Sequence, residues 1–506
     1  MVSLQWKRKI PIIFLVLIFL TASLSQITQS TDKTNNILQG ISPGDIDNLP
    51  PGASISSSPY NVTILVEINR IRCLNEETNN PHVYLDIFID GQSAMWWQEV
   101  FTGKEITIDW PVAAATIPYK PQEPVFIDIQ LWEKHYLGSD QLCDISQGTG
   151  GTSTPVSLVY DVKRGEWTGD DFLCDPNGYG HTSGYEDGSY TQNDYEIWFD
   201  IYQLTGHEYY SGYDRLTWYE KQNVYGLNPD ISQDNGDIDG DGIPNWWEDK
   251  YGYDLLTWED HENRDPDNDG LSNSEEYLTH GWYSDPYAQD IFIEVDYMQG
   301  KHIWDDPYVF PVESQYLLCD AFAKQGITVH IDDGALGGGG DLLLYDDGMD
   351  GRELRSARLK YFLQGNPTNW RRGVFHYALI CSQMEWSGRP AGGRMFYTDS
   401  HVVGGQYVLN WAPLFYLQGS DYYTGFASVF MHELGHTLGL MRFEGIDNEN
   451  SRFPWNEEYW QWGPYHSCMN YRYVYKLVDY SNGDDEEYDQ NDWGIIDLTL
   501  INHAGW

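Results

Sequence analysis

Two histidines and a glutamate near the C-terminus have the spacing of a catalytic metal site. They are His432, Glu433 and His436, in the pattern His-Glu-x-x-His. Residues four apart share one face of a helix, so both imidazoles could bind one metal ion with Glu433 beside it. Zinc held by two imidazoles and a third protein ligand keeps an open position for a water that a glutamate can deprotonate. The alternative is a buried helix with two hydrogen-bonded histidines.

Residues that follow the helix extend the pattern. Gly439 comes three residues after His436, where a helix can end in a left-handed residue, and Met469 lies in the polar and aromatic turn Ser-Cys-Met-Asn-Tyr. This combination resembles the metzincin clan of zinc endopeptidases, whose helix is His-Glu-x-x-His-x-x-Gly and whose methionine turn underlies the metal. The resemblance implies that Met469 packs beneath the zinc ligands and that Tyr471 approaches the zinc or stabilises the oxyanion.

The third zinc ligand departs from the metzincin pattern. The clan has His or Asp six residues after the second histidine, but Arg442 occupies that position here and cannot bind a cation. We expect Asp447 to complete the site, because a short insertion would still leave a carboxylate in the returning loop. The alternatives are Glu457 or Glu458, at the spacing of the thermolysin-like clan, and His466.

Two acidic loops earlier in the chain have the spacing of calcium-binding loops. Both place Asp at positions 1, 3 and 5, Gly at position 6 and Glu at position 12. Short carboxylates converge as the chain wraps an ion, glycine permits the sharp turn, and the position-7 carbonyl and the last glutamate complete the shell. The predicted ligands are Asp237, Asp239, Asp241, the Ile243 carbonyl and Glu248 in the first loop, and Asp265, Asp267, Asp269, the Leu271 carbonyl and Glu276 in the second.

Each loop continues into a short helical stretch, at 243–251 and 271–280, and 216–225 is similar to a degenerate third copy. With their Asn-Pro and Asp-Pro endings, the loops resemble bacterial thrombospondin type-3-like repeats. Because the module has few apolar residues, we expect calcium ions to be structural and to make it a rigid spacer between its neighbours.

The segment before these loops alternates apolar and polar residues in short runs, at 62–68, 83–90, 125–132, 156–160 and 195–202. Gly, Pro, Asn and Asp separate the runs, which predicts an antiparallel β-sandwich. The layout resembles the calcium-dependent membrane-binding sandwich of protein kinase C. Its acidic strand ends have no fixed ligand spacing, so we interpret them as solvated edges; they are Asp86, Asp90, Asp170 and Asp171.

The C-terminal region predicts a strand–helix–strand unit over 290–298, 312–324 and 326–334, then a strand over 375–381. An edge strand within 396–410 would precede the zinc helix. In metzincins such a strand holds the substrate by main-chain pairing, and 396–398 and 408–410 are the candidates. A final packing helix is expected at 493–500.

Composition limits the partners and the compartment. The chain has 77 acidic and 29 basic residues, a net charge of −48, which excludes nucleic-acid binding by a basic surface and favours cations. Basic residues at 7–9 and an apolar run at 10–20 predict a secretory signal. No later segment is apolar over 18 residues, so we expect no integral membrane segment after cleavage. Secretion permits disulfides among the six cysteines, whose pairing stays open.

The predicted protein is therefore multidomain and secreted, or attached at the cell surface. Its parts are a signal peptide at 1–25, a flexible linker at 26–58, an antiparallel β-sandwich at 59–205, a calcium-loop and short-helix module at 206–288, and an α+β zinc metalloprotease domain with a mixed sheet at 289–506. We expect a monomeric, calcium-stabilised zinc endopeptidase that acts on polypeptides. The alternative is a non-catalytic calcium-binding surface or adhesion protein with a metzincin-like fold, which Arg442 favours.

Overall fold

The structure is a computed structural model that describes residues 61–503, with internal exceptions. The exceptions are 75–79, 96–98, 119, 121–122, 136–137, 148–153, 163–165, 172, 174–179, 188–192, 206–224, 229–235, 283, 303, 335–337, 387–388, 418, 442–445, 447–449 and 484–486. The expected signal peptide, the linker and most of the degenerate third repeat lie outside the described residues.

Two antiparallel sheets form the first part of the chain. The four-stranded sheet has the order β10-β11-β1-β5, and the second has the path β3-β2-β6-β8-β9, with β4 and β7 beside it. Burial alternates along β2 and β6, and both sheets turn their apolar faces into one core. The strands are β1 (Asn61–Cys73), β2 (His82–Ile89), β3 (Gln92–Ser93), β4 (Phe101–Thr102), β5 (Glu105–Pro118), β6 (Val125–Glu133), β7 (Gln141–Leu142), β8 (Val156–Asp161), β9 (Glu166–Gly169), β10 (Gly180–Ser183) and β11 (Tyr195–Thr205), and η1 (Gly184–Asp187) follows β10.

The segment with the acidic loops carries two short helices, α3 (Asn245–Tyr251) and α4 (Asn273–Thr279), and then η4 (His280–Trp282). A capping box between Ser272 and Glu275 starts α4, and Gly252, with φ 75°, ends α3. The module has a small aromatic core of its own, which the apolar content of the sequence did not suggest. Its buried members are Ile243, Trp246, Trp247, Tyr251 and Tyr253.

A mixed sheet organises the C-terminal part, in the order β13-β12-β15-β19-β18 with β14 on β12. β12, β13, β15 and β19 are parallel, and β18 is antiparallel and ends the order. The strands are β12 (Asp290–Met298), β13 (Thr328–Asp332), β14 (Leu342–Leu343), β15 (Phe375–Cys381), β18 (Gly393–Tyr397) and β19 (Ser400–Gly404), and β16 (Met384–Trp386) and β17 (Arg389–Ala391) form a separate hairpin.

Helices cover both faces of this sheet, which explains why β15 is buried along its whole length. Helices α5 and α8 pack on one face with a large apolar cluster, and α6 packs on the other. The helices are α5 (Val312–Ala323), α6 (Gly351–Ala357), η5 (Arg358–Phe362), α7 (Gly405–Leu417), α8 (Tyr422–Thr437), α9 (Glu457–Gln461) and η7 (Leu498–His503).

Two C-terminal expectations were wrong in detail. The edge strand β18 includes only 396–397 of the expected region, whereas 408–410 lies inside α7. The residues around 408–410 do not alternate strictly between apolar and polar, so their pattern did not distinguish a strand from a helix. The tail has a turn at 493–495 and a 3-10 helix from Leu498 in place of the expected packing helix.

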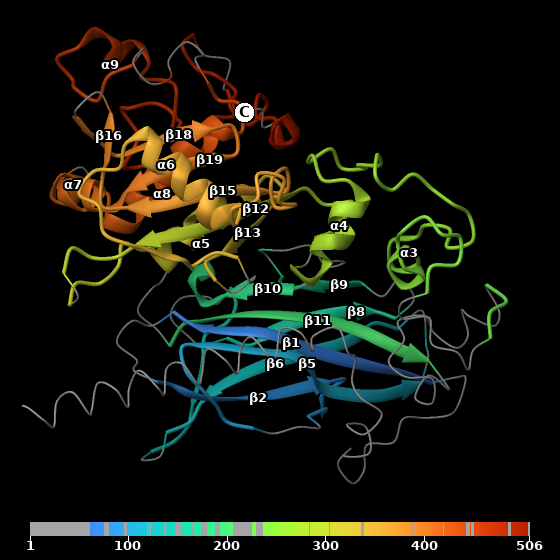
Figure 1. The fold of residues 1–506 in the computed structure, drawn as a ribbon. Coiled ribbons are helices and arrows are strands. Elements are labelled where there is room, and N and C mark those ends of the chain that lie inside the picture. The colour runs from blue at the N-terminus through green and yellow to red at the C-terminus, as the bar shows by residue number, and fades with distance from the viewer. Residues whose placement is uncertain are drawn as a thin grey trace, which may run out of the picture.

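The sandwich packs directly against the C-terminal domain, which lies above it in Figure 1, with α3 and α4 to one side. Arg72 of β1 reaches across to Asp333 at 2.8 Å and to Gln315 of α5 at 3.0 Å. Tyr185 and Tyr316 meet edge to face, with ring centroids 5.9 Å apart. The segment with the acidic loops therefore does not separate the two domains, contrary to the spacer expected from the sequence.

Within the described residues, no helix combines the length and apolar character needed to cross a membrane. In the same part of the chain, Cys143, Cys319, Cys381 and Cys468 are buried and form no disulfide with one another.

Candidate zinc and calcium sites

Helix α8 presents the His-Glu-x-x-His residues from a buried position. Asp421 caps its N-terminus by accepting a hydrogen bond from the Thr424 amide at 2.7 Å. Its apolar residues pack in the cluster shared with α5, including Phe426, Phe430 and Leu434. This packing holds the helix that carries His432, Glu433 and His436 in place.

Both histidines have their Nδ1 atoms committed to backbone carbonyls. His432 Nδ1 lies 2.9 Å from the Cys468 carbonyl oxygen, and His436 Nδ1 lies 2.7 Å from that of Leu440. A carbonyl can only accept, so each Nδ1 carries a proton, and in a neutral ring the lone pair is then on Nε2. This is the outer hydrogen bond that orients metal-binding histidines. The two ring centroids are 4.9 Å apart.

Gly439 makes the hydrogen bond of His436 possible. Its φ of 97° is disfavoured for residues with a Cβ, and the turn lets the Leu440 amide bond the Gly435 carbonyl at 2.9 Å. The Leu440 carbonyl is thereby placed against the His436 ring.

The turn after α9 lies against the helix between the two histidines. A methyl group added to Gly435 would sit 2.8 Å from the sulfur of Met469, which is fully buried. The Tyr471 ring stacks on His432 with centroids 5.8 Å apart and 24° between the planes. The family resemblance predicted that Met469 and Tyr471 lie near the two histidines, and the structure places Met469 against Gly435 and Tyr471 on His432.

Glu433 lies directly beneath the edge strand β18. It is 7% exposed, and a methyl group on Gly393 would lie 2.6 Å from its Cγ and Oε1 atoms. Burial lowers the pKa of neighbouring Arg394, and the charge of Glu433 opposes that shift. Burial also raises the pKa of Tyr475 to about 12, with a smaller contribution from Glu433. The carboxylate and the edge strand therefore share one location.

The proposed third ligand, Asp447, lies outside the described residues, as does Arg442. The alternatives Glu457, Glu458 and His466 are exposed. Among the described residues, no group with three ligand atoms within 4.8 Å of one another joins His432 and His436 to any of these three.

The first acidic loop turns its carboxylates inward. Asp237, Asp239 and Asp241 place oxygens within 4.8 Å of one another, and the Gly242 amide bonds Asp237 at 3.1 Å. Glu248 is fully buried, and its oxygens have no hydrogen-bond partner within the described chain. Burial is the main cause that raises the pKa of Glu248 to about 8, and the negative charges of the nearby aspartates add to this shift. A divalent cation would compensate this accumulation of negative charge.

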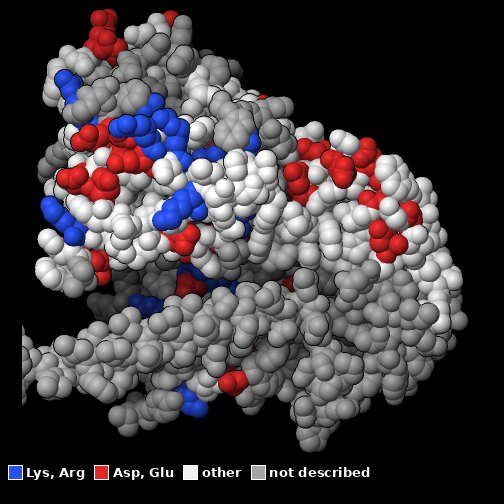
Figure 2. All heavy atoms as spheres, viewed as in Figure 1, with Lys and Arg blue, Asp and Glu red and all other residues white. Residues whose placement is uncertain are grey.

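The second loop repeats the arrangement. Asp265, Asp267 and Asp269 form a group of the same size, and the Gly270 amide bonds Asp265 at 3.1 Å. Burial, followed by the charge of a neighbouring aspartate, raises the pKa of Asp267 to about 9 and that of Asp269 to about 8. Acidic side chains gather on the surface over α3 and α4 in Figure 2. Ligation by the Ile243 and Leu271 carbonyls stays a prediction.

Two residues that the loop pattern did not include belong to these acidic groups. His261 groups with Asp241 and Glu248, and Asp290 groups with Asp269 and Glu276. Both lie beyond the twelve-residue loop, so loop spacing gave no signal for them. Gly393 was also missed, because its contact with Glu433 depends on how strand and helix pack.

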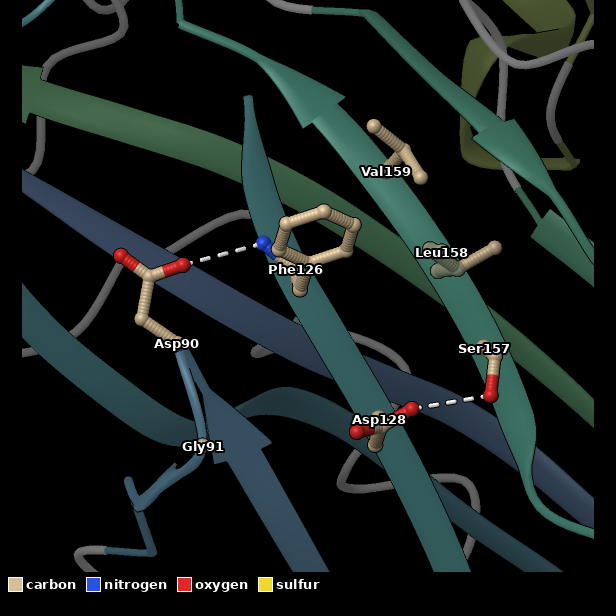
Figure 3. A pocket seen from close by; sticks show the side chains of 7 residues that line it. All are labelled: Asp90, Gly91, Phe126, Asp128, Ser157, Leu158 and Val159. Atoms are coloured by element: carbon tan, nitrogen blue, oxygen red, sulfur yellow. Dashed lines mark hydrogen bonds between the residues drawn. The ribbon is translucent and has the colours of Figure 1, made fainter. Parts of the chain in front are cut away.

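A separate open groove of about 650 Å³ lies on the sandwich (Figure 3). Asp90 accepts a hydrogen bond from the Phe126 amide at 3.1 Å, and Asp128 accepts one from the Ser157 hydroxyl at 2.8 Å. Asp170 accepts from the Ser157 amide at 3.0 Å. These acids stabilise neighbouring strands, as solvated strand-edge residues can.

No family model and no curated protein matches the chain. Among solved structures, human GIVD cytosolic phospholipase A2 in complex with methyl gamma-linolenyl fluorophosphonate is 10% identical over 28% of this chain and 17% of that chain, with a TM-score of 0.18. A second structure of human GIVD cytosolic phospholipase A2 is 11% identical over 30% of this chain and 17% of that chain, with a TM-score of 0.19. At these TM-scores the likeness carries no argument about this chain.

Proposed function

We propose that this chain is a zinc-dependent endopeptidase stabilised by calcium in its central module. One observation supports the proposal most directly: His432 and His436 each direct Nδ1 to a backbone carbonyl, which in the neutral ring puts the lone pair on Nε2, the atom that would bind the metal. When bound, zinc would polarise the scissile carbonyl and acidify a water molecule. We propose Asp447 as its third ligand.

In this proposal Glu433 is the general base. It would accept the proton of the attacking water and pass it to the leaving amine, while the peptide carbon gains an oxygen and loses its nitrogen. The partly enclosed position of Glu433 under β18 supports this role, because it limits competing solvent around the carboxylate.

The edge strand β18 would hold the substrate. It pairs with β19 on one side and ends the strand order of the sheet. An extended peptide could add to its other side by main-chain hydrogen bonds. Because Gly393 of this strand lies over Glu433, a peptide paired here would pass close to the base. Tyr471, which stacks on His432, would donate a hydrogen bond from its hydroxyl group to the developing oxyanion.

Casein digestion by the zinc-loaded chain tests the proposal, with Glu433→Gln as the key variant. We expect that variant to bind zinc normally and to lose at least about 100-fold in rate, because only the general base is removed. Glu487→Gln is the matched control, since Glu487 is an exposed glutamate in the same domain and is not a candidate zinc ligand. It should cleave like the wild type.

The same assay decides between the proposal and its rival. Zinc binding without any cleavage by the wild type would favour the non-catalytic surface or adhesion protein. Full activity of Glu433→Gln would rule out Glu433 as the general base. Loss of zinc in Asp447→Ala, with retention in Glu457→Ala, is the result expected for the third ligand.

A further inference from the structure

Glu276 is buried where the calcium module meets the first strand of the C-terminal sheet. Its exposed fraction is 0%, and neither of its carboxylate oxygens has a hydrogen-bond partner among the described residues. Asp269 and Asp290 are 2% and 5% exposed, and the three residues place oxygens within 4.8 Å of one another. Asp269 belongs to the second loop, whereas Asp290 is the first residue of β12.

The contacts of Asp290 orient it into this group. Its Oδ1 lies 2.7 Å from His330 Nε2 on the neighbouring strand β13, and its Oδ2 accepts from the Asp285 amide at 3.0 Å. Its own amide donates to Asp269 Oδ2 at 2.8 Å. Hydrogen bonds of this kind from outer residues hold ligating carboxylates in place at metal sites.

Three clustered carboxylates in a buried position are costly without a compensating charge. Burying one unpaired charge is already costly, and burying three charges together costs a free energy comparable with the whole stability of a domain. A divalent cation would offset this cost, and the two unpartnered oxygens of Glu276 could then act as its ligands.

The preceding repeat contains the same arrangement. Asp241, Glu248 and His261 form a group within 4.8 Å, and Glu248 is again buried with both oxygens unpartnered within the described chain. His261 follows Asp241 by 20 residues, and Asp290 follows Asp269 by 21. In both repeats, the last loop glutamate therefore meets a side chain from the segment that follows.

We propose that Asp269, Glu276 and Asp290 bind a divalent cation, with Asp290 as a ligand that the C-terminal domain supplies. The all-oxygen set fits calcium. This inference rests on the calcium binding proposed above, but it adds a ligand and a role. The ion would tie the calcium module to β12, the strand between β13 and β15, so that calcium stabilises the start of the C-terminal sheet.

Calcium titration of the full chain by calorimetry, with calcium chloride as the probe, tests this site. Asp290→Asn keeps the size of the side chain and removes its charge. We therefore expect the calcium affinity of one class of sites to fall about tenfold or more. Glu262→Gln is the matched control, because this exposed acid belongs to the same module and to none of the metal groups. It should bind calcium like the wild type.

Amide hydrogen exchange of the wild type covers the case in which Asp290→Asn fails to fold. Calcium should slow exchange together in the second loop and at the start of β12. Unchanged exchange in β12, or equal calcium affinity of a folded Asp290→Asn and the wild type, would overturn the Asp290 site while leaving calcium binding intact. A wild type that binds no calcium would overturn both proposals.

Discussion

At the scale of single residues, Gly393 controls the space around the proposed base. A methyl group there would lie 2.6 Å from the Cγ and Oε1 atoms of Glu433, so this side chain would have to shift. Gly393→Ala should therefore displace Glu433 by about 1 Å and lower casein cleavage up to about 100-fold, with little change in melting temperature. Gly281→Ala is the control, since a methyl group at Gly281 meets nothing within 4 Å. Wild-type activity of Gly393→Ala would contradict this account.

Gly435 lies where helix α8 packs on Met469 and Tyr480, so a substitution there tests this packing. Its added methyl group would lie 2.8 Å from the Met469 sulfur and 2.9 Å from the Tyr480 hydroxyl, both buried. Because these neighbours have little room, Gly435→Ala should cost about 1–3 kcal/mol of unfolding free energy, measured by urea denaturation. An unchanged transition would show that Met469 does not pack against the helix.

Some residues of the candidate site can be predicted from the sequence because they lie close together along the chain. His432, Glu433 and His436 lie within a little over one helical turn, so their spacing alone places them together. The contact of Gly393 with Glu433 and that of Asp290 with Glu276 join elements far apart in the chain. No local pattern encodes such contacts, and only packing reveals them.

At the scale of elements, the contact of β1 with the C-terminal domain depends on Arg72. Burial opposes its charge, but Asp333, Glu105 and Glu196 more than offset this and raise its pKa. Arg72→Ala would leave buried Glu196 and partly buried Asp333 without this partner, and it should cost about 3–5 kcal/mol of unfolding free energy. Arg352→Ala, which removes an exposed ion pair, should change the unfolding free energy far less. Equal losses in the two variants would contradict the importance of this contact.

Regular elements were predicted where one period dominates. The alternating run at 125–132 corresponds to β6, and the expected helix at 312–324 corresponds to α5. The run at 408–410 has no clear period and belongs to a helix. The direct contact between sandwich and C-terminal domain had no sequence signal, because Arg72 and Asp333 are 261 residues apart.

At the scale of the whole molecule, calcium and pH should act on stability together. Glu248, Asp267 and Asp269 have pKa values raised to about 8, 9 and 8 in the folded chain. The calcium-free folded state therefore binds more protons than the unfolded state, and its stability falls as pH rises from about 5 to about 8. Melting temperature measured in EGTA should decline over this range. With saturating calcium the decline should largely disappear, and an equal decline in both conditions would contradict calcium binding by these groups.

Calcium removal should also change where the molecule opens. Because the loops carry clustered acids around a small aromatic core, the module should loosen first. Limited proteolysis in EGTA should cut within 237–288 before the sandwich, while zinc stays bound. Cleavage sites unaffected by calcium would show that the ions are not structural.

The position of zinc itself tests the central claim most directly. Crystals of the full chain grown with zinc should give an anomalous peak at the zinc edge, about 2.0–2.1 Å from Nε2 of both His432 and His436. A carboxylate oxygen from the segment after α8, expected from Asp447, should lie within about 2.2 Å of the same peak. Absence of a peak between the two rings, in crystals that hold zinc elsewhere, would contradict the account.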